Sequence, residues 1–130
     1  MRPVEDALSD NDVRVLVVDD FVDAAQSLAL VLSMSGYVAR IAHDGASALR
    51  ITEEFLPHCI LLDVKMPGID GLELTRRLRS SYGDDIVLVA VTGGSADEAR
   101  VSETFELVDH YLSKPVDMAK LESILPPRQG

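Results

Sequence analysis

Short apolar runs that each end at a polar residue recur along this chain. They are residues 15–18 before Asp19 and Asp20, 59–62 before Asp63, 87–91 before Thr92, and 111–112 shortly before Lys114. Continuous runs of Val, Leu and Ile are typical of strands buried on both faces of a parallel sheet. Open α/β sheets bind ligands at the edge where their parallel strands end, so the pattern predicts a shared site at that edge.

Between these runs, apolar residues recur with helical spacing. From Val22 to Leu32 they are three or four residues apart, and Gly36 is placed to end that helix in a left-handed conformation. Residues suited to start a helix head the later segments: Asp44, Asp70, Ser95 and, in the last one, Pro115 with Asp117. The predicted strands are residues 13–18, 37–42, 58–63, 86–91 and 107–112, with a helix after each. This alternation predicts an α/β fold, a doubly wound (βα)5 sheet with helices on both faces.

Length and charge narrow the classes of protein that the chain can belong to. Its 130 residues fit one domain, which we place at residues 12–125, with 1–11 as a flexible leader and 126–130 as a tail or the start of a linker. Twelve basic against 22 acidic residues give a formal charge of −10, which disfavours direct binding to nucleic acid. No apolar stretch approaches the ~20 residues that span a membrane, and no signal peptide is seen, so a cytoplasmic location is expected.

The polar residues at the strand ends suggest chemistry on phosphorus. If the first and third strands are neighbours, Asp19, Asp20 and Asp63 converge. Like charges ~4 Å apart repel by about 4 kcal/mol at an effective dielectric constant of ~20, so a cation is expected, and oxygen ligands favour Mg²⁺ or Mn²⁺. Asp63 could then attack phosphorus and form an acyl phosphate, with the metal, Lys114 and Thr92 neutralising the phosphoryl oxygens.

Taken singly, each of these residues has an ordinary structural explanation. An aspartate after a strand is usually a turn residue or a helix cap, Thr92 could be a turn residue, and Lys114 a solvated charge. Their joint placement at four strand ends is far more specific than any member. The three histidines, His43, His58 and His110, show no paired ligand spacing and are not expected to do chemistry. Cys59 lies within an apolar run and is expected to be a buried, inert thiol.

With these positions identified, residues 12–125 resemble a response regulator receiver domain of two-component signalling. The resemblance lies in Val17-Val18-Asp19-Asp20, the segment from Leu61 to Gly71 around Asp63, Val91-Thr92-Gly93, and Tyr111-Leu112-Ser113-Lys114-Pro115. It implies a flavodoxin-like fold with strand order 2-1-3-4-5.

The resemblance also implies a role for each matching residue. Asp63 would accept a phosphoryl group from a sensor histidine kinase or a histidine phosphotransfer protein, as in a phosphorelay. The metal would be held by Asp19, Asp20, Asp63 and the backbone carbonyl of Lys65, and the phosphoryl oxygens by Thr92 and Lys114. Thr92 and Tyr111 would form the switch that reshapes the face of helix four, strand five and helix five. A cis Lys114-Pro115 peptide bond is expected as well.

Some positions depart from the commonest receiver pattern. Gly93 stands where a small alanine is frequent, and residues 106–109 replace a turn of small residues, so the end of the fourth predicted helix is expected to be displaced. Lys65 and Gly94 lie two residues beyond Asp63 and Thr92, flanking the path of an attacking water. We hypothesise that this pair sets the lifetime of the acyl phosphate.

Three functions compete at this stage. The leading one is a phosphorylation-controlled switch, which catalyses only its own phosphorylation and dephosphorylation and is not a turnover enzyme. The alternatives are a degenerate receiver serving as an interaction module and a Mg²⁺-dependent aspartyl-phosphate phosphohydrolase, which would want a carboxylate where Lys65 stands. The sequence does not name the kinase, the effector or the output, nor whether phosphorylation drives homodimer formation. It is equally silent on whether the receiver stands alone or is cut from a hybrid kinase or larger regulator.

Overall fold

Five parallel strands form one sheet in the computed structural model, which describes residues 12–63, 71–92 and 106–125. They are β1 (Arg14–Val18), β2 (Val38–Ala42), β3 (Cys59–Asp63), β4 (Val87–Thr92) and β5 (His110–Ser113). Their order in the sheet is β2-β1-β3-β4-β5, as expected. The chain first adds β2 on one side of β1 and then returns to add β3 on the other side. The topological reversal therefore lies between β1 and β3.

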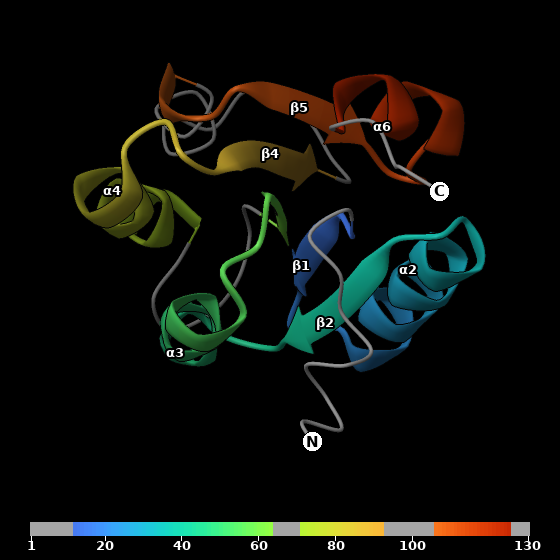
Figure 1. Ribbon diagram of the computed structural model, residues 1–130, viewed down its shortest axis with the longest axis horizontal. Helices are drawn as coiled ribbons and strands as arrows, with labels where there is room; N and C mark the ends of the chain where they lie inside the picture. Colours follow the sequence, from blue (N-terminus) through green and yellow to red (C-terminus); the bar gives the residue numbers. More distant parts are fainter. Residues whose placement is uncertain (1–11, 64–70, 93–105, 126–130) are drawn as a thin grey trace.

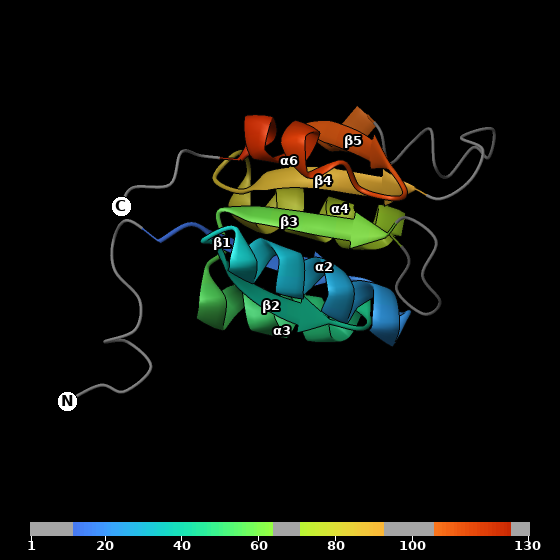
Figure 2. The same ribbon diagram turned by 90° about the vertical axis from the view of Figure 1, so that its right-hand side faces the viewer.

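Helices cover both faces of this sheet. Helices α2 (Val22–Met34) and α6 (Met118–Ile124) lie on one face, and α3 (Gly45–Phe55) and α4 (Gly71–Tyr82) lie on the other (Figures 1 and 2). Alternate strand residues therefore enter two separate cores, Val15 and Leu61 on the side of α2 and α6, Leu16 and Ile60 on the side of α3 and α4. These four side chains are at most 1% exposed, which explains why the strands read as continuous apolar runs.

The helix ends follow the local signals in the sequence. Asp44 Oδ1 accepts a hydrogen bond from Ser47 N at 2.7 Å, and Asp117 Oδ1 accepts one from Ala119 N at 2.9 Å, so both predicted N-caps are confirmed. Gly36 has a φ of 97° just after α2, a conformation that glycine adopts without a steric penalty. The Lys114-Pro115 peptide bond is cis, as the receiver resemblance implied.

Two element boundaries differ from the prediction by more than one residue. Helix α4 continues to Tyr82 rather than ending at Arg79, and β5 begins at His110 rather than at residue 107. Arg79 accounts for the second difference, because its Nε donates to the Leu107 carbonyl at 2.7 Å and its Nη2 to Asp109 Oδ2 at 2.8 Å. Asp109 Oδ2 also accepts from Leu88 N at 2.8 Å, so side-chain contacts hold the segment before β5. The helix predicted from Ser95 and the cap at Asp70 lie outside the described residues.

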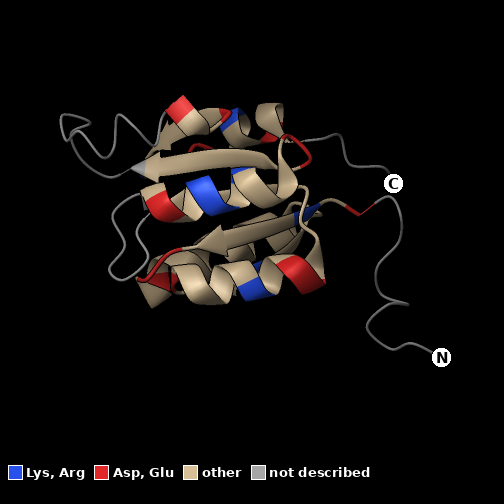
Figure 3. Ribbon diagram, turned by 90° about the vertical axis from the view of Figure 1, so that its left-hand side faces the viewer, with Lys and Arg blue, Asp and Glu red and all other residues tan. Residues whose placement is uncertain are grey.

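Charged residues lie on the outer surfaces of the helices. Figure 3 shows Lys and Arg interspersed with Asp and Glu on α3 and α4, over largely uncharged strands. Within the described ranges, no helix is both long and apolar enough to cross a bilayer. Cys59 is fully buried in β3, and burial raises the pKa of its thiol, as expected for an unreactive cysteine.

Candidate functional site

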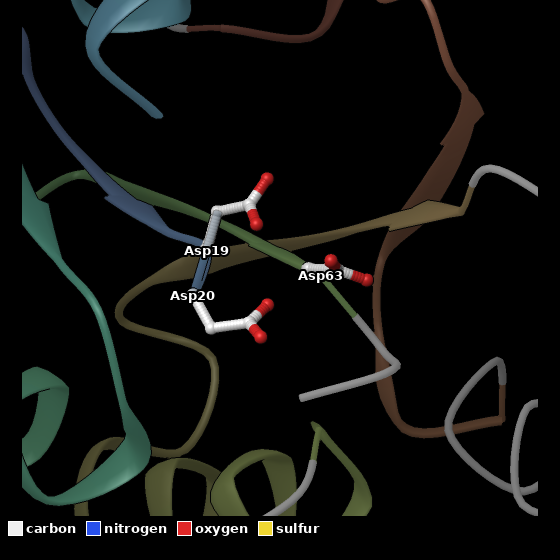
Figure 4. A group of neighbouring side chains, drawn as sticks. All are labelled: Asp19, Asp20 and Asp63. Atoms are coloured by element: carbon white, nitrogen blue, oxygen red, sulfur yellow. The ribbon is translucent and has the colours of Figure 1, made fainter. Parts of the chain in front are cut away.

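Three carboxylates meet at the carboxyl ends of β1 and β3. These strands are neighbours, with Val18 paired to Leu62, so Asp19 and Asp20 emerge beside Asp63. One oxygen from each carboxylate lies within 4.8 Å of the others. Figure 4 shows the three side chains directed into a common space. The predicted convergence of these acids is confirmed.

Lys114 brings a positive charge to the same place. It follows β5, and its Nζ lies 3.3 Å from Asp19 Oδ2 and 3.3 Å from Asp63 Oδ2. Burial alone would lower the pKa of Lys114, but the carboxylates of Asp63 and Asp19 outweigh it and raise that pKa. The ammonium is therefore charged at neutral pH and partly offsets the repulsion within the acidic group.

Thr92 reaches this edge through its backbone. It is the last residue of β4, next to Val91, which is paired in register with Asp63, and it is itself paired with Ser113 of β5. The carboxyl ends of β1, β3, β4 and β5 thus carry the four groups that the sequence predicted. Lys65 and Gly94 lie outside the described residues.

Asp19 is held by contacts to both its backbone and its side chain. Its N–H donates to the Ala42 carbonyl at 3.0 Å, and its Oδ1 accepts from Phe21 N at 2.9 Å. The ring Nδ1 of His43 lies 3.1 Å from the Asp19 carbonyl oxygen. Asp19 is only 6% exposed, so these contacts define its orientation before any ligand arrives.

The sequence did not predict a contact from His43 to the site, because His43 belongs to no ligand motif. The available signal was its place directly after β2, which the predicted strand order sets beside β1. The other two histidines lie elsewhere: His58 Nδ1 accepts from Arg14 N at 3.0 Å, and the exposed His110 begins β5. Of the histidines, none joins a candidate metal cluster in the described part of the chain.

A cavity of about 340 Å³ adjoins the charged residues. Its lining combines Asp19, Asp63 and Lys114 with apolar side chains of α2, such as Leu28 and Val31, and with Pro115, Val116 and Met118. The volume lies at the lower end of the range of small-ligand sites, roughly 300–1,000 Å³. The charged groups therefore lie beside space that can admit a group as small as a phosphoryl.

The donor set is suited to a hard divalent cation. Three carboxylates face a single ammonium, so the described site carries excess negative charge and offers only oxygen ligands. Mg²⁺ and Mn²⁺ prefer carboxylate, carbonyl and water oxygens and are commonly bound through one or two carboxylates while keeping several waters. The residues present fit such an ion.

Tyr111 lies in β5, three residues before Lys114, and its side chain is largely exposed to solvent. It is 61% exposed. A tyrosine in a buried strand is more often a core aromatic, and this exposure rules out that position for Tyr111.

Comparison with known proteins places the chain in one family. The model of the "Response regulator receiver domain" family matches residues 15–126. The response regulator MprA of Mycobacterium ulcerans is 41% identical over 109 residues, which cover 84% of this chain and 47% of that protein. MprA of Mycobacterium tuberculosis strain H37Rv is 40% identical over the same length. The chain thus spans about half the length of these curated relatives.

Solved structures with the same fold include receiver proteins from several bacteria. The receiver domain from Methylobacillus flagellatus has a TM-score of 0.76 and 32% identity, covering 87% of this chain and 95% of that one. The response regulator TrrA from Thermotoga maritima, solved in complex with Mg²⁺ and BeF, has a TM-score of 0.76 and 28% identity, covering 86% and 95%. Together with the strand order and the acidic group, these matches show that the chain belongs to the response regulator receiver domain family.

Proposed function

We propose that this chain is a phosphorylation-dependent signalling switch in which Asp63 accepts a phosphoryl group. The observation that carries the proposal is the position of the Asp63 carboxylate, which lies within 4.8 Å of the acidic pair and 3.3 Å from the Lys114 Nζ. A carboxylate in this setting has beside it both the acids that suit a metal ion and a cation for the phosphoryl oxygens. The donor is a sensor histidine kinase or a histidine phosphotransfer protein.

In the transfer step, an Asp63 carboxylate oxygen forms a bond to phosphorus while the bond from phosphorus to the donor's imidazole nitrogen breaks. The electron pair leaves with that nitrogen, which takes up a proton. Lys114 exchanges its contact with Asp63 for one with a phosphoryl oxygen, and the Thr92 hydroxyl donates to another. Bound Mg²⁺ or Mn²⁺ supplies neutralising charge to the carboxylates and to the phosphoryl group.

The metal would be held by Asp19, Asp20, Asp63 and the carbonyl of Lys65. Asp19 and Asp20 directly follow β1, and Asp63 ends β3, so the residues that would hold the ion come from the two neighbouring strands at the topological reversal. Lys65 and Gly94 would control how fast water attacks the acyl phosphate. Family membership and the spacing of the residues support both these roles.

The output would pass through Thr92 and Tyr111 to the surface that includes β5 and α6. Exposure of Tyr111 supports this, because an exposed ring can leave its position without giving up contacts in the core. The receiver unit would comprise residues 12–125 and act in the cytoplasm on an effector of unknown kind. Since the relatives are about twice as long, the effector could belong to the same polypeptide or to a separate protein.

Incubation with phosphoramidate and Mg²⁺, read by intact mass, tests this function. The parent protein should gain one phosphoryl group, and Asp63→Asn should gain none. Asp85→Asn is the matched control, since Asp85 is exposed in the turn after α4 and distant in sequence from the site. A phosphoryl adduct that persists in Asp63→Asn would contradict the proposal. Turnover of a generic phosphoester by the parent would instead favour a phosphohydrolase.

A further inference from the structure

We propose that His43 is a positioning residue for the acidic pair, acting through the backbone carbonyl of Asp19. Its ring Nδ1 lies 3.1 Å from that oxygen, a hydrogen-bond distance. A carbonyl oxygen only accepts, so Nδ1 carries the proton and donates. The inference rests on the proposed function, since fixing Asp19 and Asp20 matters only if these acids hold a metal.

The contact continues the pairing of β1 with β2 beyond the ends of both strands. Val18 is in register with Ala42, and Asp19 N–H still donates to the Ala42 carbonyl at 3.0 Å. The next residue on β2's side is His43, whose side chain satisfies the Asp19 carbonyl. A side chain thereby replaces the backbone partner that the sheet no longer offers at this point.

The bonded carbonyl belongs to the peptide unit that joins Asp19 to Asp20. Holding this unit in one orientation sets the direction of the Asp20 side chain relative to that of Asp19. The Asp19 carboxylate is itself fixed by Phe21 N at 2.9 Å. Groups that orient metal ligands raise affinity because the ligands are already arranged when the ion binds. Loss of the His43 donor should therefore weaken metal binding while leaving the fold unchanged.

Calorimetric titration with Mg²⁺ alone tests this assignment without any phosphoryl donor. His43→Ala should bind Mg²⁺ roughly two- to tenfold more weakly than the parent, the effect of losing one hydrogen bond. His43→Asn should retain most of the affinity, since its amide nitrogen is attached to Cγ as Nδ1 is and can donate to the same oxygen. His110→Ala is the matched control, because His110 is exposed and begins β5 at the opposite edge of the sheet. Without Mg²⁺ all variants should remain folded, and the melting temperature of His43→Ala should fall by no more than the few degrees expected for one hydrogen bond.

Phosphorylation of Asp63 by phosphoramidate supplies a second readout. For His43→Ala the initial rate should fall at limiting Mg²⁺ and return to the parent's rate at saturating Mg²⁺. Equal Mg²⁺ affinity in His43→Ala and parent, or no rescue by His43→Asn, would overturn the role of His43. A parent protein that binds no Mg²⁺ and gains no phosphoryl group would overturn the proposed function itself.

Discussion

Lys114 is the residue on which the charge balance of the site depends. Its ammonium contacts two of the three carboxylates, each at 3.3 Å, and their charges raise its pKa against the opposing effect of burial. The same ammonium already neutralises part of the carboxylate charge that a bound metal ion would neutralise. If the site binds both ligands as proposed, Lys114 would have opposite effects on them, repelling a cation and attracting a phosphoryl group.

Lys114→Met should consequently strengthen Mg²⁺ binding while slowing phosphorylation. Partly exposed ion pairs are worth up to about 1 kcal/mol, so the affinity should rise roughly two- to fivefold. Lys114→Arg, which keeps the charge, is the control and should stay near the parent. Calorimetry gives the affinities and intact mass the rates. Weaker Mg²⁺ binding in Lys114→Met would show that the ammonium does not compete with the ion.

His58 should make stability depend on pH below neutrality. Burial, together with the nearby Arg14 charge, lowers its pKa, and its Nδ1 accepts from Arg14 N at 3.0 Å, which only the neutral ring can do. The unfolded chain therefore binds the proton more readily, and stability rises with pH in this range. The contribution is complete above the unfolded pKa of about 6.5 and is lost as pH falls through the folded value.

The measurement compares urea unfolding of the parent and His58→Asn between pH 7.5 and 5, conditions set by that window. The asparagine oxygen can still accept from Arg14 N but does not titrate. The parent should lose more unfolding free energy than the variant as pH falls. Parallel profiles would mean that His58 protonates equally in both states.

At the scale of elements, the signals that predicted boundaries correctly were local. Asp44 and Asp117 cap helices through hydrogen bonds to residues two or three positions away, so the sequence pattern contains both partners. The start of β5 was predicted wrongly because its partners are distant. Arg79, 30 residues earlier, binds Asp109 and the Leu107 carbonyl and thereby holds residues that the apolar pattern assigned to the strand.

Asp109→Ala should destabilise this junction by roughly 0.5–1.5 kcal/mol, since Asp109 Oδ2 accepts from both Arg79 and Leu88 N but is partly exposed. Burial would raise the pKa of Asp109, but those hydrogen bonds outweigh it and lower the pKa. Asp84→Ala is the control, because Asp84 Oδ1 lies 3.7 Å from Nη1 of the same Arg79 and the Asp84 side chain is fully exposed. Urea unfolding should show a lower unfolding free energy for Asp109→Ala and an unchanged one for Asp84→Ala. Equal losses of unfolding free energy in Asp109→Ala and Asp84→Ala would mean that removal of one negative charge causes the effect, and not loss of these hydrogen bonds.

For the whole molecule, the sheet explains why most of the site was predictable. Parallel strands all end at one edge, so Asp19, Asp20, Asp63 and Lys114 could be grouped from their positions after apolar runs. What could not be predicted was which neighbours hold these groups. The contact of His43 with the Asp19 carbonyl depends on the register of β1 and β2, and no residue pattern encodes that register.

Mg²⁺ should stabilise the folded protein as a whole, because the unfolded chain does not gather the three acids. At a free concentration 100 times the dissociation constant the gain is about 2.7 kcal/mol, seen as a rise in the thermal unfolding midpoint. Asp20→Asn should show a smaller rise. Na⁺ at equal ionic strength controls for screening. An equal rise of the unfolding midpoint with Na⁺ would show that charge screening, and not specific Mg²⁺ binding, stabilises the protein.

The contacts around Asp19 also bear on the speed of ion capture. Three of its atoms already have partners contributed by Ala42, Phe21 and His43, so folding itself completes most of the arrangement. Little conformational search then remains when the cation arrives. The association rate of Mg²⁺ should therefore be limited by the slow loss of water from its hydration shell. Mn²⁺, which exchanges water more readily, should bind faster to the same site.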